Sequence, residues 1–201
     1  MAQSQRGAET RARILEAAAL CFTRAGYDSS GVAAICDGAG VSKGAFYHHF
    51  PSKQAVFLAL FDRWIDGLQH AIDATRIPGE TVPQRLEAMA GVAQQVLQAT
   101  EGQIPLFLEF WHRATKDPEV WQTLIEPYRR FRATFAGMVR EGIAEGSVRP
   151  VDPDLAAHVL VSLGVGLVLQ SALDPGDDID HQAADQAIRL FLIGLTDGRE
   201  Q

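Results

Sequence analysis

The stretch from Gly40 to Lys53, GVSKGAFYHHFPSK, gathers side chains that suit contact with a polyanion. Lys43 carries a positive charge that can meet a phosphate or a guanine, and Tyr47 offers a hydroxyl group to a phosphate oxygen. Gly44 has no side chain and so lets the backbone approach a ligand closely. These are the residue types of a nucleic-acid contact, provided that the fold presents them on one exposed surface.

The adjacent histidines of this stretch raise the question of a metal site. Successive helical residues point about 100° apart, so His48 and His49 do not share a face as a helical chelating pair does. The other four histidines are scattered singly, and Cys21 and Cys36 lie within apolar helical patterns as small reduced core residues. We expect no metal and no cofactor.

Signals of catalysis are missing from the sequence. It contains no glycine-rich phosphate loop, no G-x-S-x-G elbow and no H-E-x-x-H pair. The acidic cluster at 174–180 lacks the spacing and the terminal glutamate of a calcium loop, so a solvated inter-helix loop is the better interpretation. We therefore do not expect an enzyme.

The net charge of −7 is unevenly spread along the 201 residues. Residues 1–55 hold six Lys/Arg against four Asp/Glu, which gives +2, and the remainder, with 12 against 21, sums to −9. A polyanion would meet the N-terminal part, although ordinary surface scatter is the plainer explanation of the asymmetry. Neither a secretory signal nor a membrane-spanning run is visible, which predicts a cytoplasmic protein without a membrane partner.

Apolar residues recur at intervals of three and four along almost the whole chain, and this spacing predicts helices. Ile14, Ala18 and Phe22 give the first example, and Gly26 supplies a stop. No alternating strand pattern is found. The sequence predicts an all-α protein of about nine helices, at about 9–25, 32–39, 42–50, 53–74, 83–99, 104–116, 117–145, 153–173 and 181–195.

The second and third of these helices are short and joined through glycine, which predicts a helix-turn-helix at about 31–50. Ser42 can cap the third helix, and Phe46 and Phe50 are one turn apart on its inner face. Such a unit places the N-terminal part of its second helix in the major groove of DNA. Packing by the two phenylalanines would then hold a helix that is too short to be stable alone.

The run GYDSSGVAAICDGAGVSKGAFYHHFPSKQAVF resembles the N-terminal DNA-binding domain of the TetR family of bacterial transcriptional regulators (TetR/AcrR type). The resemblance implies a DNA-binding domain at 1–52 and a ligand-binding and dimerisation domain at 53–201. It implies a homodimeric repressor that a small-molecule effector releases from a palindromic double-stranded operator. It also implies DNA contacts at Ser30, Ser42, Lys43, Gly44, Ala45, Tyr47, His48, His49 and Lys53.

The sequence departs from the family pattern in the second helix. Gly31, Ala33 and Ala34 stand where hydroxylated or charged residues are common, which predicts fewer phosphate contacts from that helix. An alternative function therefore stays open, that of a helical small-molecule-binding protein with weak or lost DNA binding. Steeply salt-dependent binding to a palindrome would distinguish the two.

Aromatic residues concentrate in the C-terminal part. Since aromatic side chains are usually buried, we expect most of them to belong to the hydrophobic core. A pocket with an aromatic lining and a few polar groups is how a helical bundle holds an organic ligand. We expect the ligand-binding residues to include Trp64, Phe107, Trp111, His112, Trp121, Tyr128 and Gln170. In the last two helices, small and apolar residues suit either a core or a dimer interface, and the resemblance favours an interface at Gly164, Ala184, Ala187, Ile188, Phe191 and Leu195.

Overall fold

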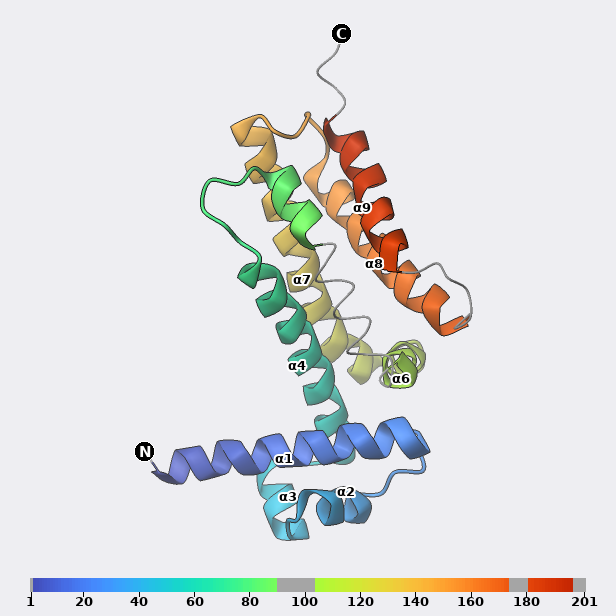
Figure 1. The fold of residues 1–201 in the computed structure, drawn as a ribbon. Coiled ribbons are helices and arrows are strands. Elements are labelled where there is room, and N and C mark those ends of the chain that lie inside the picture. The colour runs from blue at the N-terminus through green and yellow to red at the C-terminus, as the bar shows by residue number, and fades with distance from the viewer. Residues whose placement is uncertain (1, 90–103, 174–180, 197–201) are drawn as a thin grey trace. The chain divides into compact units, whose positions relative to one another are not determined.

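The computed structural model describes residues 2–89, 104–173 and 181–196, and all their regular secondary structure is helical (Figure 1). The all-α prediction is therefore confirmed. The labelled helices are α1 (Ala2–Ala25), α2 (Val32–Ala39), α3 (Lys43–His49), α4 (Lys53–Ala74), α6 (Ile104–Ala114), α7 (Pro118–Glu145), α8 (Pro153–Leu173) and α9 (His181–Thr196), and residues 82–89 are also helical.

The chain forms two compact units. The head unit comprises Met1–Ile65 and Gly102–Glu126, and the body unit comprises Asp66–Glu101 and Pro127–Gln201. This grouping differs from the division expected at residue 52, because α6 and the first turns of α7 join the N-terminal helices. Sequence patterns report on neighbouring residues, whereas α6 packs against α1, which is far away along the chain. This grouping could therefore not be predicted from the sequence pattern.

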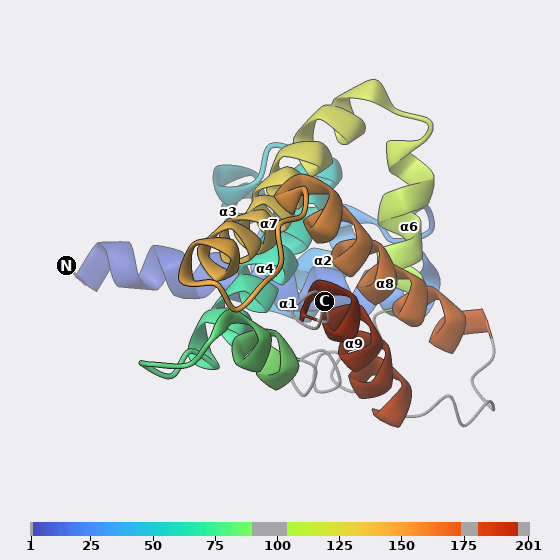
Figure 2. The same ribbon diagram turned by 90° about the horizontal axis from the view of Figure 1, so that it is seen from above.

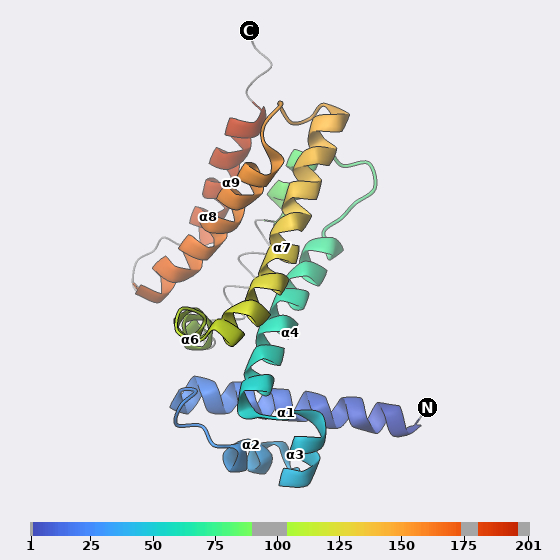
Figure 3. The same ribbon diagram turned by 180° about the vertical axis from the view of Figure 1, so that it is seen from behind.

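Helix α1 is the longest element of the head unit, and it lies across α2 and α3 (Figures 1 and 3). Its buried stripe contains Ile14, Ala18 and Phe22, at most 2% exposed. The helix begins at Ala2 rather than near Glu9, because the polar residues before Glu9 continue it without adding to the apolar stripe. It ends at Gly26, whose φ of 77° is a left-handed conformation that glycine adopts without strain.

The turn between α2 and α3 depends on two local devices. Gly40 has a φ of 62°, and its N–H group points to the carbonyl oxygens of Asp37 and Cys36 at the end of α2. The Ser42 hydroxyl then accepts a hydrogen bond of 3.1 Å from the Ala45 N–H, so serine caps α3 as predicted. Together they fix the start of a seven-residue helix that would not be stable alone.

Aromatic rings fill the core of the head unit where α1, the following loop and α4 meet. The ring centroids of Phe22 and Tyr27 are 5.1 Å apart, and those of Tyr27 and Phe57 are 4.7 Å apart. Edge-on and tilted pairs at these distances add to the stabilisation from apolar burial. Tyr27, at 8% exposed, is thus a core residue in a loop.

The body unit packs residues 82–89 and the C-terminal part of α7 with α8 and α9, and α8 and α9 run antiparallel beside each other (Figures 1 and 2). Val82, Leu86 and Val139 are at most 1% exposed in its core. Gly142 allows the closest approach, since a Cβ atom there would lie 2.6 Å from Cγ2 of Val148. None of the described helices is long and apolar enough to cross a membrane.

Candidate nucleic-acid interface

Helix α3 has one buried face and one exposed face. Phe46 is fully buried and Phe50 is 3% exposed, which confirms that both hold the helix on its scaffold. The opposite face presents Lys43 and Gly44 to solvent, and the Tyr47 side chain is 55% exposed. The basic and phenolic groups of this short helix are therefore accessible from outside, while two phenylalanines hold it from within.

The other groove-facing candidates surround this face. Ser42 and His48 are exposed, whereas Ala45 and His49 are half-buried. The imidazole centroids of His48 and His49 are 5.1 Å apart with the rings nearly perpendicular. Among the described residues no group of three His, Cys, Asp or Glu side chains could hold a metal ion.

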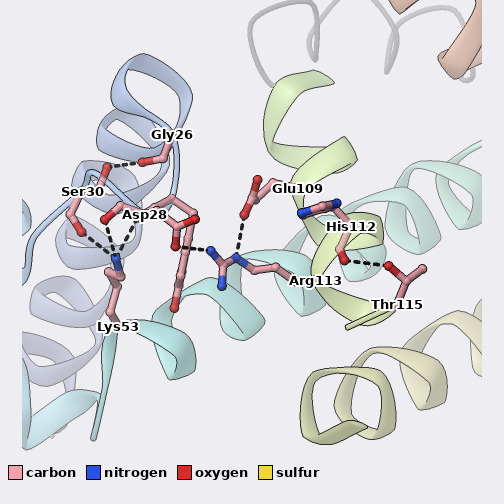
Figure 4. Close-up of polar contacts among 9 residues, drawn as sticks. Gly26, Asp28, Ser30, Lys53, Glu109, His112, Arg113 and Thr115 are labelled. Atoms are coloured by element: carbon pink, nitrogen blue, oxygen red, sulfur yellow. Dashed lines mark hydrogen bonds and ion pairs between the residues drawn. The ribbon is translucent and has the colours of Figure 1, made fainter. Parts of the chain in front are cut away.

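Ser30 lies in the loop between α1 and α2, and the side chain of Lys53, the first residue of α4, reaches the same loop (Figure 4). Both residues make contacts within the chain. The Ser30 side chain is buried and donates to the Gly26 carbonyl oxygen at 2.7 Å. The Lys53 ammonium donates to the carbonyl oxygens of Tyr27 at 2.7 Å and Ser30 at 2.9 Å. It also lies 4.2 Å from the centroid of the Tyr27 ring. This geometry gives Lys53 and Ser30 a part in fixing the loop, and a phosphate contact by either remains a prediction.

The electrostatics of the Lys53 ammonium follow from this environment. Desolvation lowers the pKa of Lys53 from its ordinary value of 10.5, and nearby Arg113 acts in the same direction. The Asp28 carboxylate opposes both effects. The carbonyl oxygens of Tyr27 and Ser30, together with the Tyr27 ring, thus hold a cation in a partly dehydrated position.

The sequence offers Arg113 of α6 as a polar candidate for the ligand pocket, but it does not predict the contact by which Arg113 joins α6 to the same loop (Figure 4). Its guanidinium pairs with the Asp28 carboxylate, and its Nε donates to the Glu109 carboxylate at 2.6 Å. The guanidinium carbon lies 3.7 Å from the centroid of the Tyr27 ring. Burial raises the pKa of the Tyr27 phenol above its ordinary value, and the Arg113 guanidinium opposes this shift.

The outward face of α2 offers little for a phosphate to bind. Gly31, Ala33 and Ala34 are all exposed, and none carries a polar side-chain atom. The departure from the family pattern noted in the sequence thus lies on the surface of the helix-turn-helix. Phosphate contacts from other parts of the head unit would have to compensate for it.

The candidate ligand-binding residues are divided between the two units. Trp111, His112 and Trp121 belong to the head unit and are exposed, with the tryptophan side chains at 38% and 44%. Trp64 is a half-buried member of the same unit, and the Phe107 side chain lies outside the described residues. The body unit contributes half-buried Tyr128 and exposed Gln170.

The candidate interface residues of α8 and α9 differ in how far they are buried. Ile188 and Leu195 are buried in the core of their own chain, and Phe191 and Ala187 are half-buried. Gly164 is exposed, and the Ala184 side chain lies outside the described residues. The apolar side chains that point outward are others, namely Leu155, Val159 and Leu169 on α8 and Leu190 and Ile193 on α9.

Comparison with known proteins agrees with this geometry. Residues 14–60 match the bacterial regulatory proteins of the tetR family, and residues 82–196, more than half of the chain, match the C-terminal part of BetI-type transcriptional repressors. The chain belongs to the TetR family. Members of this family are DNA-binding transcriptional regulators and not enzymes, which confirms both of those predictions.

Individual TetR-family relatives cover nearly the whole chain. The Escherichia coli K12 regulator UidR is 26% identical over 191 residues, 92% of each chain. A solved structure from Pseudomonas aeruginosa PAO1 is 29% identical, with a TM-score of 0.77, over 94% of this chain and 90% of the other. A Saccharomonospora viridis protein, solved in complex with choline, has a TM-score of 0.76 at 24% identity over 92% and 96% of the two chains, which shows a shared fold.

Proposed function

We propose that this TetR-family protein is a homodimeric repressor that binds a palindromic operator and leaves it when a small-molecule effector binds. The observation that carries the proposal is the division of α3, in which Phe46 and Phe50 are buried and Tyr47 is exposed beside Lys43. A scaffolded helix with a free polar face can enter the major groove without rearrangement. DNA binding would place the protein in the cytoplasm.

The dimer part of the proposal is supported by exposed apolar side chains on α8 and α9. Leu190 is 71% exposed and Leu155 is 63% exposed. On α8, Leu155, Val159 and Leu169 recur at helical spacing on one side. Exposed apolar side chains on two neighbouring helices are typical of an interface, and in a twofold dimer the same side chains of both copies would meet.

The effector part is supported by the contact between α6 and the loop before α2. Arg113 and the ligand-binding candidates Trp111 and His112 are on α6, and Arg113 holds Asp28. A ligand that shifted α6 would act on the helix-turn-helix through this contact, and α4 offers a second connection since it begins directly after α3. Such coupling is reciprocal, so operator DNA would weaken effector binding by the same factor.

Selection of bound fragments from genomic DNA, followed by titration of the selected duplex, tests the proposal. We expect an inverted repeat whose half-site centres are about 34–36 Å apart or somewhat more, bound by one dimer with steep salt dependence. Binding of unrelated fragments with equal affinity would contradict the repressor proposal. That result would favour the alternative of a small-molecule-binding protein, which the bare surface of α2 supports.

A further inference from the structure

Two arginines of α1 flank the recognition helix α3, one beside its C-terminal cap and one beside the turn that leads into it from α2. Arg11 places its guanidinium carbon 5.0 Å from the centroid of the Phe50 ring, and Phe50 is the residue that caps the C-terminal end of α3. Arg13 places Nη1 4.0 Å from the point where a Cβ atom would stand on Gly40, in the turn before α3. Both side chains belong to residues that are exposed.

Neither arginine is neutralised by another part of the described chain. Glu9, one turn before Arg13, and Glu16 are the acidic residues of α1 nearest to the two arginines, and the structure shows no ion pair to Arg11 or Arg13 among the described residues. Their positions differ from that of Lys53, whose ammonium is held by carbonyl oxygens. The two guanidinium groups are therefore available to an anion from outside.

We propose that Arg11 and Arg13 form a phosphate clamp that binds the DNA backbone on either side of α3, Arg11 beside its C-terminal cap and Arg13 beside the turn before it. The seven residues of α3 span about 10 Å, comparable with the roughly 12 Å width of the major groove. With α3 in the groove, guanidinium groups on either side of it come within reach of the flanking phosphates. Guanidinium groups bind phosphate oxygens through two parallel hydrogen bonds, so each arginine gives a strong and oriented contact.

The clamp explains how this chain can bind DNA although the outward face of α2 has few polar side chains for phosphate contacts. The phosphate contacts that Gly31, Ala33 and Ala34 cannot make are supplied by α1 instead. The stacking of Arg11 on Phe50 also orients its guanidinium before DNA arrives, which reduces the entropy lost on binding. This inference rests on the proposed DNA-binding function, but it assigns the charge contacts to a helix outside the helix-turn-helix.

The test measures the affinity of the full chain for the selected operator and for a random duplex of equal length over a range of salt concentrations. Because a bound dimer carries each arginine twice, Arg11→Ala and Arg13→Ala should each lower the slope of log K against log salt by about 1.8, and the double variant by about 3.6. At 0.1 M salt each lost contact corresponds to about eightfold weaker binding, to the same extent on both duplexes. Lys116→Ala, which removes the charge of an exposed residue beyond α6, is the matched control and should leave the slope unchanged.

Lysine substitutions separate charge from packing. Arg11→Lys and Arg13→Lys keep the positive charge, so they should restore most of the slope, and they keep the proposal testable if an alanine variant folds poorly. A double alanine variant that is folded and has the wild-type slope would overturn the clamp alone. Wild-type protein that binds no duplex at any salt concentration would overturn the proposed function, and the clamp with it.

Discussion

Arg113 stacks on Tyr27, with 3.7 Å between its guanidinium carbon and the ring centroid, and pairs with the adjacent Asp28. Asp28 and Arg113 are 85 residues apart in the chain. The same tyrosine is the cation–π partner of Lys53, which holds the carbonyl oxygens of the loop. One aromatic ring therefore links α6, the beginning of α4 and the loop that leads into the helix-turn-helix.

Replacing Arg113 with alanine should lower the free energy of unfolding by about 1–2 kcal/mol, because a partly buried cation–π contact is lost together with two ion pairs. Asp28→Ala is the control. The Asp28 side chain is 86% exposed, so its removal should cost about 0.5 kcal/mol or less. Urea denaturation of the two variants measures the difference, and equal midpoints would mean that stacking on Tyr27 contributes nothing.

The Glu141 carboxylate on α7 should stabilise the body unit at neutral pH and lose this effect as the pH falls. The hydrogen bond from Arg85 holds the pKa of Glu141 below its ordinary value of 4.5. A group whose pKa is depressed on folding stabilises the protein above its unfolded pKa, and this stabilisation is lost as the pH falls through the folded pKa. Because the Glu141 side chain is 45% exposed and water screens the pair, Glu141→Gln should cost only about 0.5 kcal/mol at neutral pH and progressively less in acid.

Chemical denaturation at pH values between 7 and 3 measures this dependence. Glu87→Gln is the comparison, since Glu87 pairs at 3.3 Å with Arg189 and both side chains are about half exposed. Its stability should change little at any pH. A Glu141→Gln variant whose deficit stays constant down to acid pH would show that the carboxylate is not the source.

Replacing either of two glycines of α7 with alanine should change the stability of the protein, but in opposite directions. A Cβ atom on Gly142 would lie 2.6 Å from Val148 and 3.0 Å from Val82, so Gly142→Ala should destabilise the protein by about 1–3 kcal/mol. Gly137 has open space around its Cα atom, so Gly137→Ala should stabilise the helix by about 0.5–1 kcal/mol. Thermal melting measures both variants. Melting temperatures that both rise or both fall relative to the wild type would contradict this prediction.

Leu190→Glu should weaken the proposed dimer without unfolding the chain, since Leu190 is 71% exposed and the charge would enter an apolar contact only in the dimer. Leu195→Glu instead puts charge into the core of a single chain, because Leu195 is 5% exposed. Sedimentation velocity at micromolar concentration compares the oligomeric states. Gln186→Glu, on the exposed surface of α9, is the charge control. A monomeric wild type would contradict the dimer directly.

Local signals in the sequence predicted the fold and the shape of the recognition helix well. The serine cap, the glycine turn and the two phenylalanines one turn apart are all contained within α3 and its flanks. The roles of Arg113 and Lys53 depend on contacts with a distant loop, and no pattern within either helix reveals them. On α9, periodicity placed Ile188 and Leu195 on an apolar face but could not distinguish core from interface, because both demand the same residues.

Whether α3 reads DNA is measured most directly by comparing the wild type with the Lys43→Ala/Tyr47→Phe double variant in selection from genomic fragments. Both residues are exposed on α3, so the variant should keep the wild-type melting temperature. We expect the wild type to enrich a palindrome and the variant to lose most of this enrichment. Equal enrichment of the same palindrome by both proteins, at matched salt, would contradict this account.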